Sequence, residues 1–461
     1  VLSMFCGIIL FGALARQSFD VYHFSIMISD ATEELNIPIW PFQFIMLIVF
    51  SLLCVQLVVT TLLKLMPASK TAERQALSQS TLVYFHEGTN FVLIAVPMFM
   101  LMGNIANHTG IAAGLFRATA NTLGRFPGGL AIASVFGCAG FGAISGSSTA
   151  TVLTMGRIVM PELKRYGYDQ ELGAGALSAA GTLGILIPPS LILIFYGVLT
   201  ENSIGDLFIA GIVPGLLTVV LFSALIIIIA TLNPEKAPPI PRPAAKETAL
   251  SLIEALPILA LFTLIIGGIY LGVFTPTEAS GIAVVGVIFY GLISRKLTWG
   301  AMREALTETI TTSAMLFTII LSGYIVTRFI AVTGITQNMI DFVQAMNLGP
   351  YQFIIVITIL YLILGCALDV FAMLILTVPF IYPIILHYGI DPIWFGIYIV
   401  VMAEIALITP PLGLNIFVMN SIAPDITLMR IFKGVMPFVL IELMVVALLT
   451  AFPIIALYLV K

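Results

Sequence analysis

The chain has 461 residues, of which 60% are hydrophobic and only 9% are charged, and its formal net charge is −4. A soluble domain of this length has too little interior for so much apolar surface, so the composition predicts a polytopic helical membrane protein. The charge provides no basic surface for nucleic acid, and the four cysteines lie in apolar runs without the spacing of a metal site.

Residues 1–66 are predicted to form some of the helices of a membrane scaffold, and residues 67–80 a linker. Residues 1–66 hold two apolar stretches that flank a polar one, and residues 67–80 are polar, with Lys70, Glu73 and Arg74. Because the chain opens on Val1 without a charged n-region and cleavage site, we predict no signal peptide, and we expect a leading segment to precede it.

Residues 81–232 predict a first repeat that contains a re-entrant hairpin over about 128–160. The apolar run from Gly128 to Phe141 leads into a tip of small and hydroxyl residues, Gly142 to Thr151. Each apolar half has about 12–14 residues, whereas a spanning helix needs about 20. The alternative is a single kinked helix with a serine-lined packing face.

Two adjacent prolines, Pro188 and Pro189, interrupt the following apolar run over about 170–200. Proline removes a backbone N–H and clashes with the preceding turn. Carbonyls freed in hydrocarbon have no water to bind, so broken helices are tolerated where they face protein, a cavity or an ion. We therefore predict a broken helix here, with a plain proline kink as the alternative.

A polar, proline-rich loop over residues 233–249 joins this repeat to a second one over residues 250–461. The second repeat again contains an interrupted segment, Gly365 to Phe371, which predicts a second hairpin over about 353–386. Another Pro-Pro pair then breaks the next apolar run and predicts a second broken helix over about 393–420.

The two repeats keep the same register over a turn and a helix break. Tyr166 recurs as Tyr388 and Pro188 recurs as Pro410, each 222 positions later (388 − 166 = 222; 410 − 188 = 222). Unrelated segments seldom keep register in this way, so we interpret them as two copies of one unit. Paired breaks at corresponding places are the sequence signature of a transporter's binding site.

Charge placement indicates that the two copies face opposite sides of the membrane. The turn after the first hairpin carries Arg157, Lys164 and Arg165, whereas its counterpart has His387 and Asp391 without lysine or arginine. The positive-inside rule places the first turn in the cytoplasm and the second outside. The pattern therefore predicts an inverted repeat.

Five motifs resemble the large membrane subunit of tripartite ATP-independent periplasmic (TRAP) transporters, over about residues 80–461. They are Ile144-Ser145-Gly146-Ser147, Arg165-Tyr166-Gly167-Tyr168-Asp169, Gly181-Thr182-Leu183-Gly184-Ile185-Leu186-Ile187-Pro188-Pro189-Ser190, Phe274-Thr275-Pro276-Thr277-Glu278-Ala279 and Ile408-Thr409-Pro410-Pro411-Leu412-Gly413. Residues 1–66 resemble the C-terminal half of the small subunit, with two helices where that subunit usually has four. The resemblance thus indicates fused small and large subunits.

The resemblance implies an all-α, inverted-repeat, elevator-type transporter rather than an enzyme. A transport domain of two hairpins and two broken helices would slide against a scaffold in the bacterial inner membrane. Sodium would drive uptake of a small organic anion, a carboxylate or sulfonate, delivered by a soluble periplasmic binding protein. Sodium is the only metal implied, as a coupling ion, and no organic cofactor is implied.

By the same resemblance, main-chain and hydroxyl oxygens at the hairpin tips and breaks would bind two sodium ions. The first site would use Gly142, Ser145, Gly184, Ile187 and Pro188. The second would use Gly365, Ala406, Thr409 and Leu412, with Ala406 standing where the family commonly has glycine. A carbonyl ligand does not depend on the side chain, so the second site requires only that the backbone opens there.

The substrate is expected between the two tips, near the membrane midplane. The polar side chains best placed for it are Ser147, Ser148, Thr149 and Asn415, although membrane serines often bond only to the preceding turn. Asp369 and Glu404 are acidic residues in apolar segments, where a charge is costly, so both are candidates for a supporting role.

Three other functions stay open at this stage. A membrane-embedded enzyme is disfavoured because His86-Glu87 begins a zinc-like HExxH pattern whose second histidine is replaced by Asn90. A channel also accommodates paired hairpins, but the amphipathic segments fit elevator arms better. A stand-alone sodium/carboxylate symporter differs from our prediction only in needing no binding protein.

Overall fold

The computed structural model describes residues 91–460 apart from 242, 334, 346–347 and 412. The chain divides into two compact units, one with residues 1–88 and 311–332, the other with residues 89–310 and 333–461. In the first unit the described residues 311–332 are helical, and the Thr318 and Thr327 hydroxyls donate to the carbonyls of Ala314 (2.9 Å) and Gly323 (3.0 Å). The predictions for residues 1–66 and 67–80 lie outside the described residues.

All regular elements among the described residues are helical, which confirms the all-α prediction. They are η1 (Phe91–Ile94), α4 (Ala95–Thr109), α5 (Ile111–Leu123), α6 (Gly129–Ser145), α7 (Ser148–Arg165), α8 (Gln170–Ala180), α9 (Leu183–Leu186), α10 (Leu191–Thr200), α11 (Ile204–Leu232), α12 (Ala245–Tyr270), α13 (Pro276–Ile293), α14 (Trp299–Thr333), α15 (Ile335–Ala345), α16 (Pro350–Gly365), α17 (Val370–His387), α18 (Pro392–Ile408), α19 (Leu414–Ile422), α20 (Leu428–Ala451) and α21 (Ile454–Leu457).

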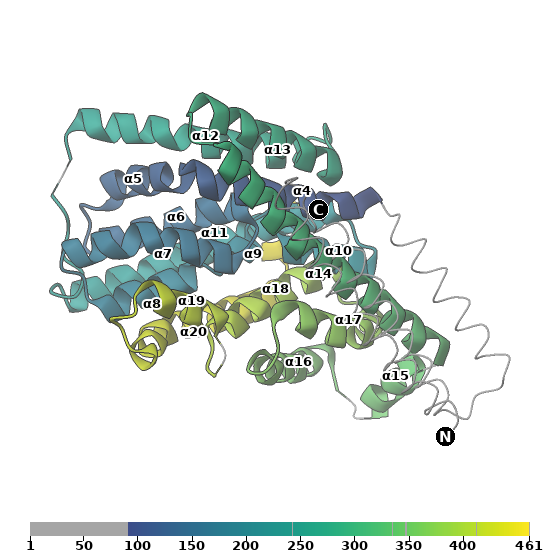
Figure 1. Ribbon diagram of the computed structural model, residues 1–461. Coiled ribbons are helices and arrows are strands. Elements are labelled where there is room, and N and C mark those ends of the chain that lie inside the picture. The colour runs from purple at the N-terminus through teal and green to yellow at the C-terminus, as the bar shows by residue number, and fades with distance from the viewer. Residues whose placement is uncertain (1–90, 242, 334, 346–347, 412, 461) are drawn as a thin grey trace, which may run out of the picture. The chain divides into compact units, whose positions relative to one another are not determined.

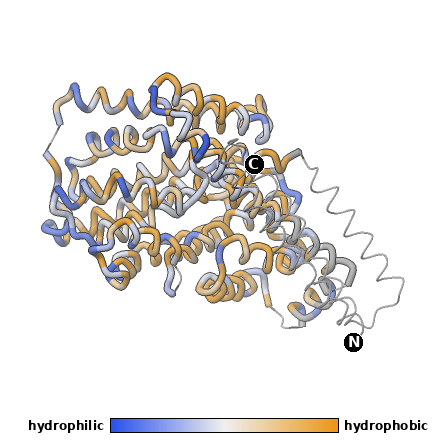
Figure 2. Tube along the Cα trace, viewed as in Figure 1, coloured by the Kyte–Doolittle hydropathy of each residue, from blue (hydrophilic) through white to orange (hydrophobic). Residues whose placement is uncertain are grey.

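Seven helical segments in the described part of the chain are long and apolar enough to cross a membrane. Helix α11 has 29 residues, α12 has 26 and α20 has 24, all above the about 20 that a bilayer requires. Hydrophobic residues run along these helices (Figure 2) and include exposed side chains such as Leu256 and Leu259 on α12. Apolar side chains exposed along spanning helices face lipid, so the chain is a polytopic membrane protein.

In the second unit the helices pack in successive layers (Figure 1). Helices α12 and α13 cover α5 and α4, α5 packs on α6, and α6 contacts both α7 and α8. Helix α8 then packs on α20. At that last contact a Cβ atom on Gly175 would strike the backbone of Gly434, because the two backbones touch directly. Small residues permit such close approach between membrane helices.

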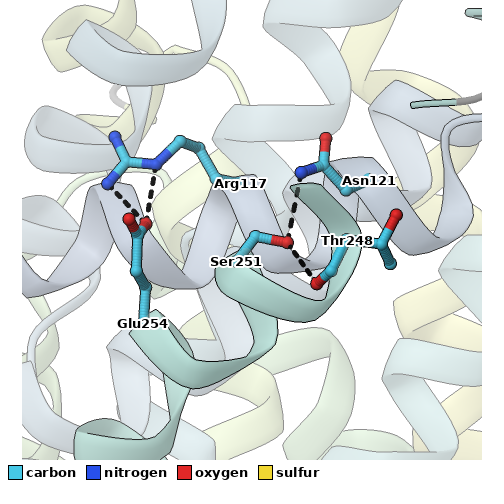
Figure 3. Close-up of polar contacts among 5 residues, drawn as sticks. All are labelled: Arg117, Asn121, Thr248, Ser251 and Glu254. Atoms are coloured by element: carbon cyan, nitrogen blue, oxygen red, sulfur yellow. Dashed lines mark hydrogen bonds and ion pairs between the residues drawn. The ribbon is translucent and has the colours of Figure 1, made fainter. Parts of the chain in front are cut away.

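The outer contact between α5 and α12 is partly polar (Figure 3). Arg117 donates from Nε (2.9 Å) and Nη2 (2.7 Å) to the same carboxylate oxygen of Glu254. One turn away, Asn121 donates to the Ser251 hydroxyl (3.1 Å), which in turn donates to the Thr248 carbonyl (2.9 Å). These contacts fix the register of α5 on α12 at the edge of the unit.

Candidate functional site

The first hairpin turns between α6 and α7 within two residues. Helix α6 ends at Ser145, and Gly146 adopts the left-handed conformation (φ 60°) that glycine tolerates best. Ser147 then caps α7, since its side chain accepts a hydrogen bond from the Ala150 N–H (3.4 Å). This short turn brings the C-terminal end of α6 against the N-terminal end of α7.

A cluster of oxygen atoms lies inside this tip. The Thr151 hydroxyl, fully buried, donates to the Ser147 carbonyl at 2.7 Å. It lies 2.8 Å from the Ser145 hydroxyl, which is itself 3.2 Å from the same Ser147 carbonyl. The cluster therefore holds two hydroxyls and one main-chain carbonyl within hydrogen-bonding distance.

The tip packs directly on the first broken helix. A Cβ on Gly142 would lie 2.6 Å from the Gly184 Cα, and a Cβ on Gly184 would lie 2.8 Å from the Ser147 carbonyl oxygen. The structure thus brings together Gly142, Ser145 and Gly184, three of the five residues predicted for the first sodium site. Ile187, by contrast, packs on Gly215 of α11.

The first break lies between α9 and α10 and is completely buried. Neither Pro188 nor Pro189, which are joined by a cis peptide bond, has an N–H to donate to the carbonyl four residues earlier. For Pro189 that carbonyl belongs to Ile185, and the Ser190 hydroxyl donates to it instead. For Pro188 the carbonyl is that of Gly184, which therefore has no helical donor.

The second hairpin and break repeat this geometry with other side chains. Asp369 caps α17 by accepting from the Ala372 N–H (2.9 Å) and stands 222 residues after Ser147, the cap of α7 (369 − 147 = 222). A Cβ on Gly365 would lie 2.6 Å from the Ala406 Cβ. The tip also meets the break where the Cys366 thiol lies 3.2 Å from the Pro410 carbonyl, the same distance as from the Leu362 carbonyl of its own helix.

The second Pro-Pro pair, Pro410-Pro411, is also cis and follows α18. Pro410 has no N–H for the Ala406 carbonyl, the counterpart of Gly184. The Thr409 hydroxyl donates to the Ile405 carbonyl (2.6 Å). Gly365, Ala406 and Thr409 of the predicted second sodium site therefore belong to one contact region, whereas Leu412 lies outside the described residues.

The predicted substrate residues fall in two places. Ser147, Ser148 and Thr149 lie at the first tip, where the Ser147 and Thr149 hydroxyls are 3.2 Å apart and both residues are half-buried. Asn415, fully buried on α19, instead donates from Nδ2 to the Ser178 carbonyl of α8 (3.1 Å). Its Oδ1 atom has no donor among the described residues.

The two acidic candidates differ in their surroundings. Asp369 is exposed and serves as the cap of α17. Glu404 is fully buried in α18, and neither of its carboxyl oxygens has a hydrogen-bond donor in the described part of the chain. Glu442 in α20 shares both properties. We did not single out Glu442 from the sequence, although it too is an acid within an apolar run.

Thr151 is a second residue that sequence reasoning missed. Its position four residues after the cap Ser147 places its hydroxyl one turn along α7, facing back to the tip. The described residues contain no group of three or more histidine, cysteine, aspartate or glutamate side chains that would hold a metal. Carbonyl and hydroxyl oxygens at the tips and breaks instead suit an alkali cation.

Comparisons with known proteins agree with this architecture. The family model described as "Tripartite ATP-independent periplasmic transporter, DctM component" matches residues 39–455. The C4-dicarboxylate TRAP transporter large permease protein DctM of Pseudomonas aeruginosa is 38% identical over 374 residues, 81% of this chain and 87% of that protein. The isethionate TRAP transporter permease protein DctMQ of Oleidesulfovibrio alaskensis is 32% identical, over 80% of this chain and 58% of that protein.

Among solved structures, the Alcanivorax borkumensis YdaH transporter is similar with a TM-score of 0.56 at 16% identity, covering 88% of this chain and 97% of that one. At this identity the similarity concerns the fold alone. The family match begins at residue 39, inside the 1–66 segment that resembles the small subunit, and the assignment of that segment stays a prediction.

Proposed function

The chain belongs to the DctM component family of tripartite ATP-independent periplasmic transporters, and we propose that it couples uptake of a small organic anion to sodium entry. Members of this family are inner-membrane permeases, not enzymes, and they work with a periplasmic substrate-binding protein. The proposal concerns the coupling ion, its ligands, the class of substrate and the movement that carries it.

One observation carries the sodium proposal: the two Pro-Pro pairs free equivalent carbonyls beside the hairpin tips. Gly184 and Ala406 both lie four residues before a proline without an N–H, and both contact the tip of their own hairpin. The backbone is not unwound at either residue, because Gly184 and Ala406 lie at the C-terminal ends of α9 and α18. Carbonyls at the C-terminal ends of half-helices coordinate sodium in broken-helix transporters. Hydroxyl groups of Ser145 and Thr409 lie beside them and add oxygen ligands without adding charge.

The substrate that we propose is a small carboxylate or sulfonate, held next to the first tip. Ser147 and Thr149 offer two hydroxyls 3.2 Å apart, and the N-terminus of α7 directly behind them favours negative charge. The names of the two relatives, which refer to a C4-dicarboxylate and to isethionate, fall in these two chemical classes. Asn415 contacts Ser178 of α8 instead and is not part of this proposal.

We further propose that the hairpins and broken helices move together as an elevator-type transport domain. Two polar contacts support their treatment as one body, because they join α10 and the loop that follows it to the second repeat. The Tyr196 hydroxyl donates to the Pro392 carbonyl (2.8 Å), and the Asn202 amide donates to the Tyr382 hydroxyl (2.9 Å). Both contacts lie beside the aromatic pair Tyr196 and Tyr382.

Uptake into proteoliposomes tests the proposal. The permease is reconstituted with its periplasmic binding protein and given a radiolabelled C4-dicarboxylate or isethionate. We expect accumulation with an inward sodium gradient, and none when choline replaces sodium. Equal uptake in choline would overturn sodium coupling. Equal uptake without the binding protein would instead favour a stand-alone symporter.

A further inference from the structure

Two fully buried glutamates lie on helices α18 and α20, which pack together in the second unit. Glu404 lies in α18 and Glu442 in α20, and each has 0% exposure. The two carboxyl groups are close enough to interact electrostatically. None of their four oxygens has a hydrogen-bond donor in the described part of the chain. The basic residues of α20, Arg430 and Lys433, stand near its exposed first turns instead.

The Thr182 hydroxyl completes this group of oxygen atoms. It lies beside the Glu404 carboxyl, in the short connection between α8 and α9. The hydroxyl also lies 2.7 Å from the Ala179 carbonyl as a donor, and its oxygen keeps lone pairs that a cation can use. The five oxygens of the two carboxyls and the hydroxyl are therefore all available as acceptors or as ligands of a cation.

Such a set of oxygens is costly without a positive partner. An ionised carboxyl in a dry interior is strongly disfavoured unless it is paired or binds a metal. Carboxyl and hydroxyl oxygens are hard ligands, which suit hard cations rather than soft metals. Two carboxyls that share one proton carry a single negative charge, which one monovalent cation balances.

The position of this group of oxygens relates it to both repeats. Thr182 and Glu404 are equivalent residues of the two copies (404 − 182 = 222). Thr182 directly precedes α9 and Glu404 lies within α18, and these two helices pack together. Each lies two residues before a carbonyl freed by proline, at Gly184 and Ala406. A cation bound here touches both repeats at once.

We propose that Thr182, Glu404 and Glu442 bind a sodium ion, separate from the two sites at the breaks. The proposal rests on the sodium coupling proposed above and adds a third ion, held between the repeats by carboxyl side chains. Because this ion contacts both breaks through adjacent residues, its binding favours the arrangement in which both breaks are formed.

Equilibrium binding of radioactive sodium to the purified, reconstituted permease tests this. We expect Glu442→Gln to bind one sodium ion fewer per protein than wild type, and Thr182→Val to raise the half-saturating sodium concentration about tenfold, which corresponds to ~1.4 kcal/mol. Glu235→Gln, in an exposed loop residue, is the matched control and binds as wild type. Thr182→Val removes only a hydroxyl, so it tests the site even if Glu442→Gln does not fold.

The double variant Thr409→Val with Glu442→Gln separates this site from the second break. We expect it to lose more bound sodium than either single variant. If Glu442→Gln and Thr182→Val bind sodium as wild type does, the two glutamates share a proton only and this inference is wrong, while sodium coupling stands. If the wild type binds no sodium, the proposed function itself fails.

Discussion

The first hairpin and break form a buried assembly, whereas the equivalent parts of the second repeat lie open. Residues 187–190 of the first break are all buried, but Pro410 and Pro411 of the second are exposed and Thr409 is half-buried. The same difference holds for the caps, since Ser147 is half-buried and Asp369 is exposed. Two copies of one backbone design thus occupy different environments.

The contacts between tip and break are also closer in the first copy than in the second. The first tip is joined to its break by backbone packing at Gly142 and Gly184 and encloses the hydroxyls of Ser145 and Thr151. The second tip is joined by a methyl contact at Ala406 and a thiol contact at Cys366. The comparison teaches that the backbone breaks occupy the same places in both copies, while side chains determine how closely each tip packs on its break.

The largest expected effect comes from adding a methyl group at each tip. Gly142→Ala places a Cβ 2.6 Å from the backbone of Gly184, and Gly365→Ala places one 2.6 Å from the side chain of Ala406. Overpacking of this kind costs about 1–3 kcal/mol, so both variants should unfold at lower temperature. The double variant Gly365→Ala with Ala406→Gly should recover part of this loss, because it removes the opposing methyl and leaves the Ala406 Cα at 3.2 Å.

The first tip allows no such recovery, since Gly184 has no side chain to remove. Thermal unfolding of the four proteins in detergent measures the difference. Equal destabilisation of the Gly365→Ala single variant and the double variant would contradict the side-chain contact that distinguishes the second tip from the first.

A smaller effect is expected from removing one hydroxyl at each site. Thr409→Val should raise the half-saturating sodium concentration for uptake about tenfold, or ~1.4 kcal/mol. The fold-decrease in protein yield should be smaller than this fold-increase in sodium concentration. Ser145→Ala should have a more modest effect, because the Thr151 hydroxyl stays next to the same carbonyl. Uptake measured against sodium concentration separates the two, and an unchanged sodium response of Thr409→Val would count against the second site.

The smallest effect is expected at the two helix caps. Asp369→Ala should cost ~1 kcal/mol by removing the cap of α17, whereas Asp369→Asn keeps an acceptor and should cost much less. Ser147→Ala should cost less than Asp369→Ala, since the bond to the Ala150 N–H is longer (3.4 Å) than that to Ala372 (2.9 Å). Thermal unfolding is the measurement, and a larger loss in Ser147→Ala would reverse the predicted order.

Much of the fold followed from the sequence because proline and glycine act locally. The pairs that begin at Pro188 and Pro410 follow the ends of α9 and α18, and the spacing of 222 residues between the two copies extends to the caps Ser147 and Asp369. The hydropathy of the long runs likewise predicted spanning helices such as α11 and α12.

The sequence was less informative about side chains that meet across helices. Asn415 contacts Ser178 rather than the hairpin tip, because helix rotation and packing decide which neighbour a buried amide finds. Glu442 could not be predicted as a site residue from local sequence, because its relation to Glu404 arises only when the fold brings α18 and α20 together.

The contact between α8 and α20 has a mechanical consequence. Gly175 and Gly434 meet backbone to backbone, so no side chain is available there to rotate and absorb a displacement. A displacement of one helix is therefore transmitted to the other, and we expect α8 and α20 to move together as one rigid body.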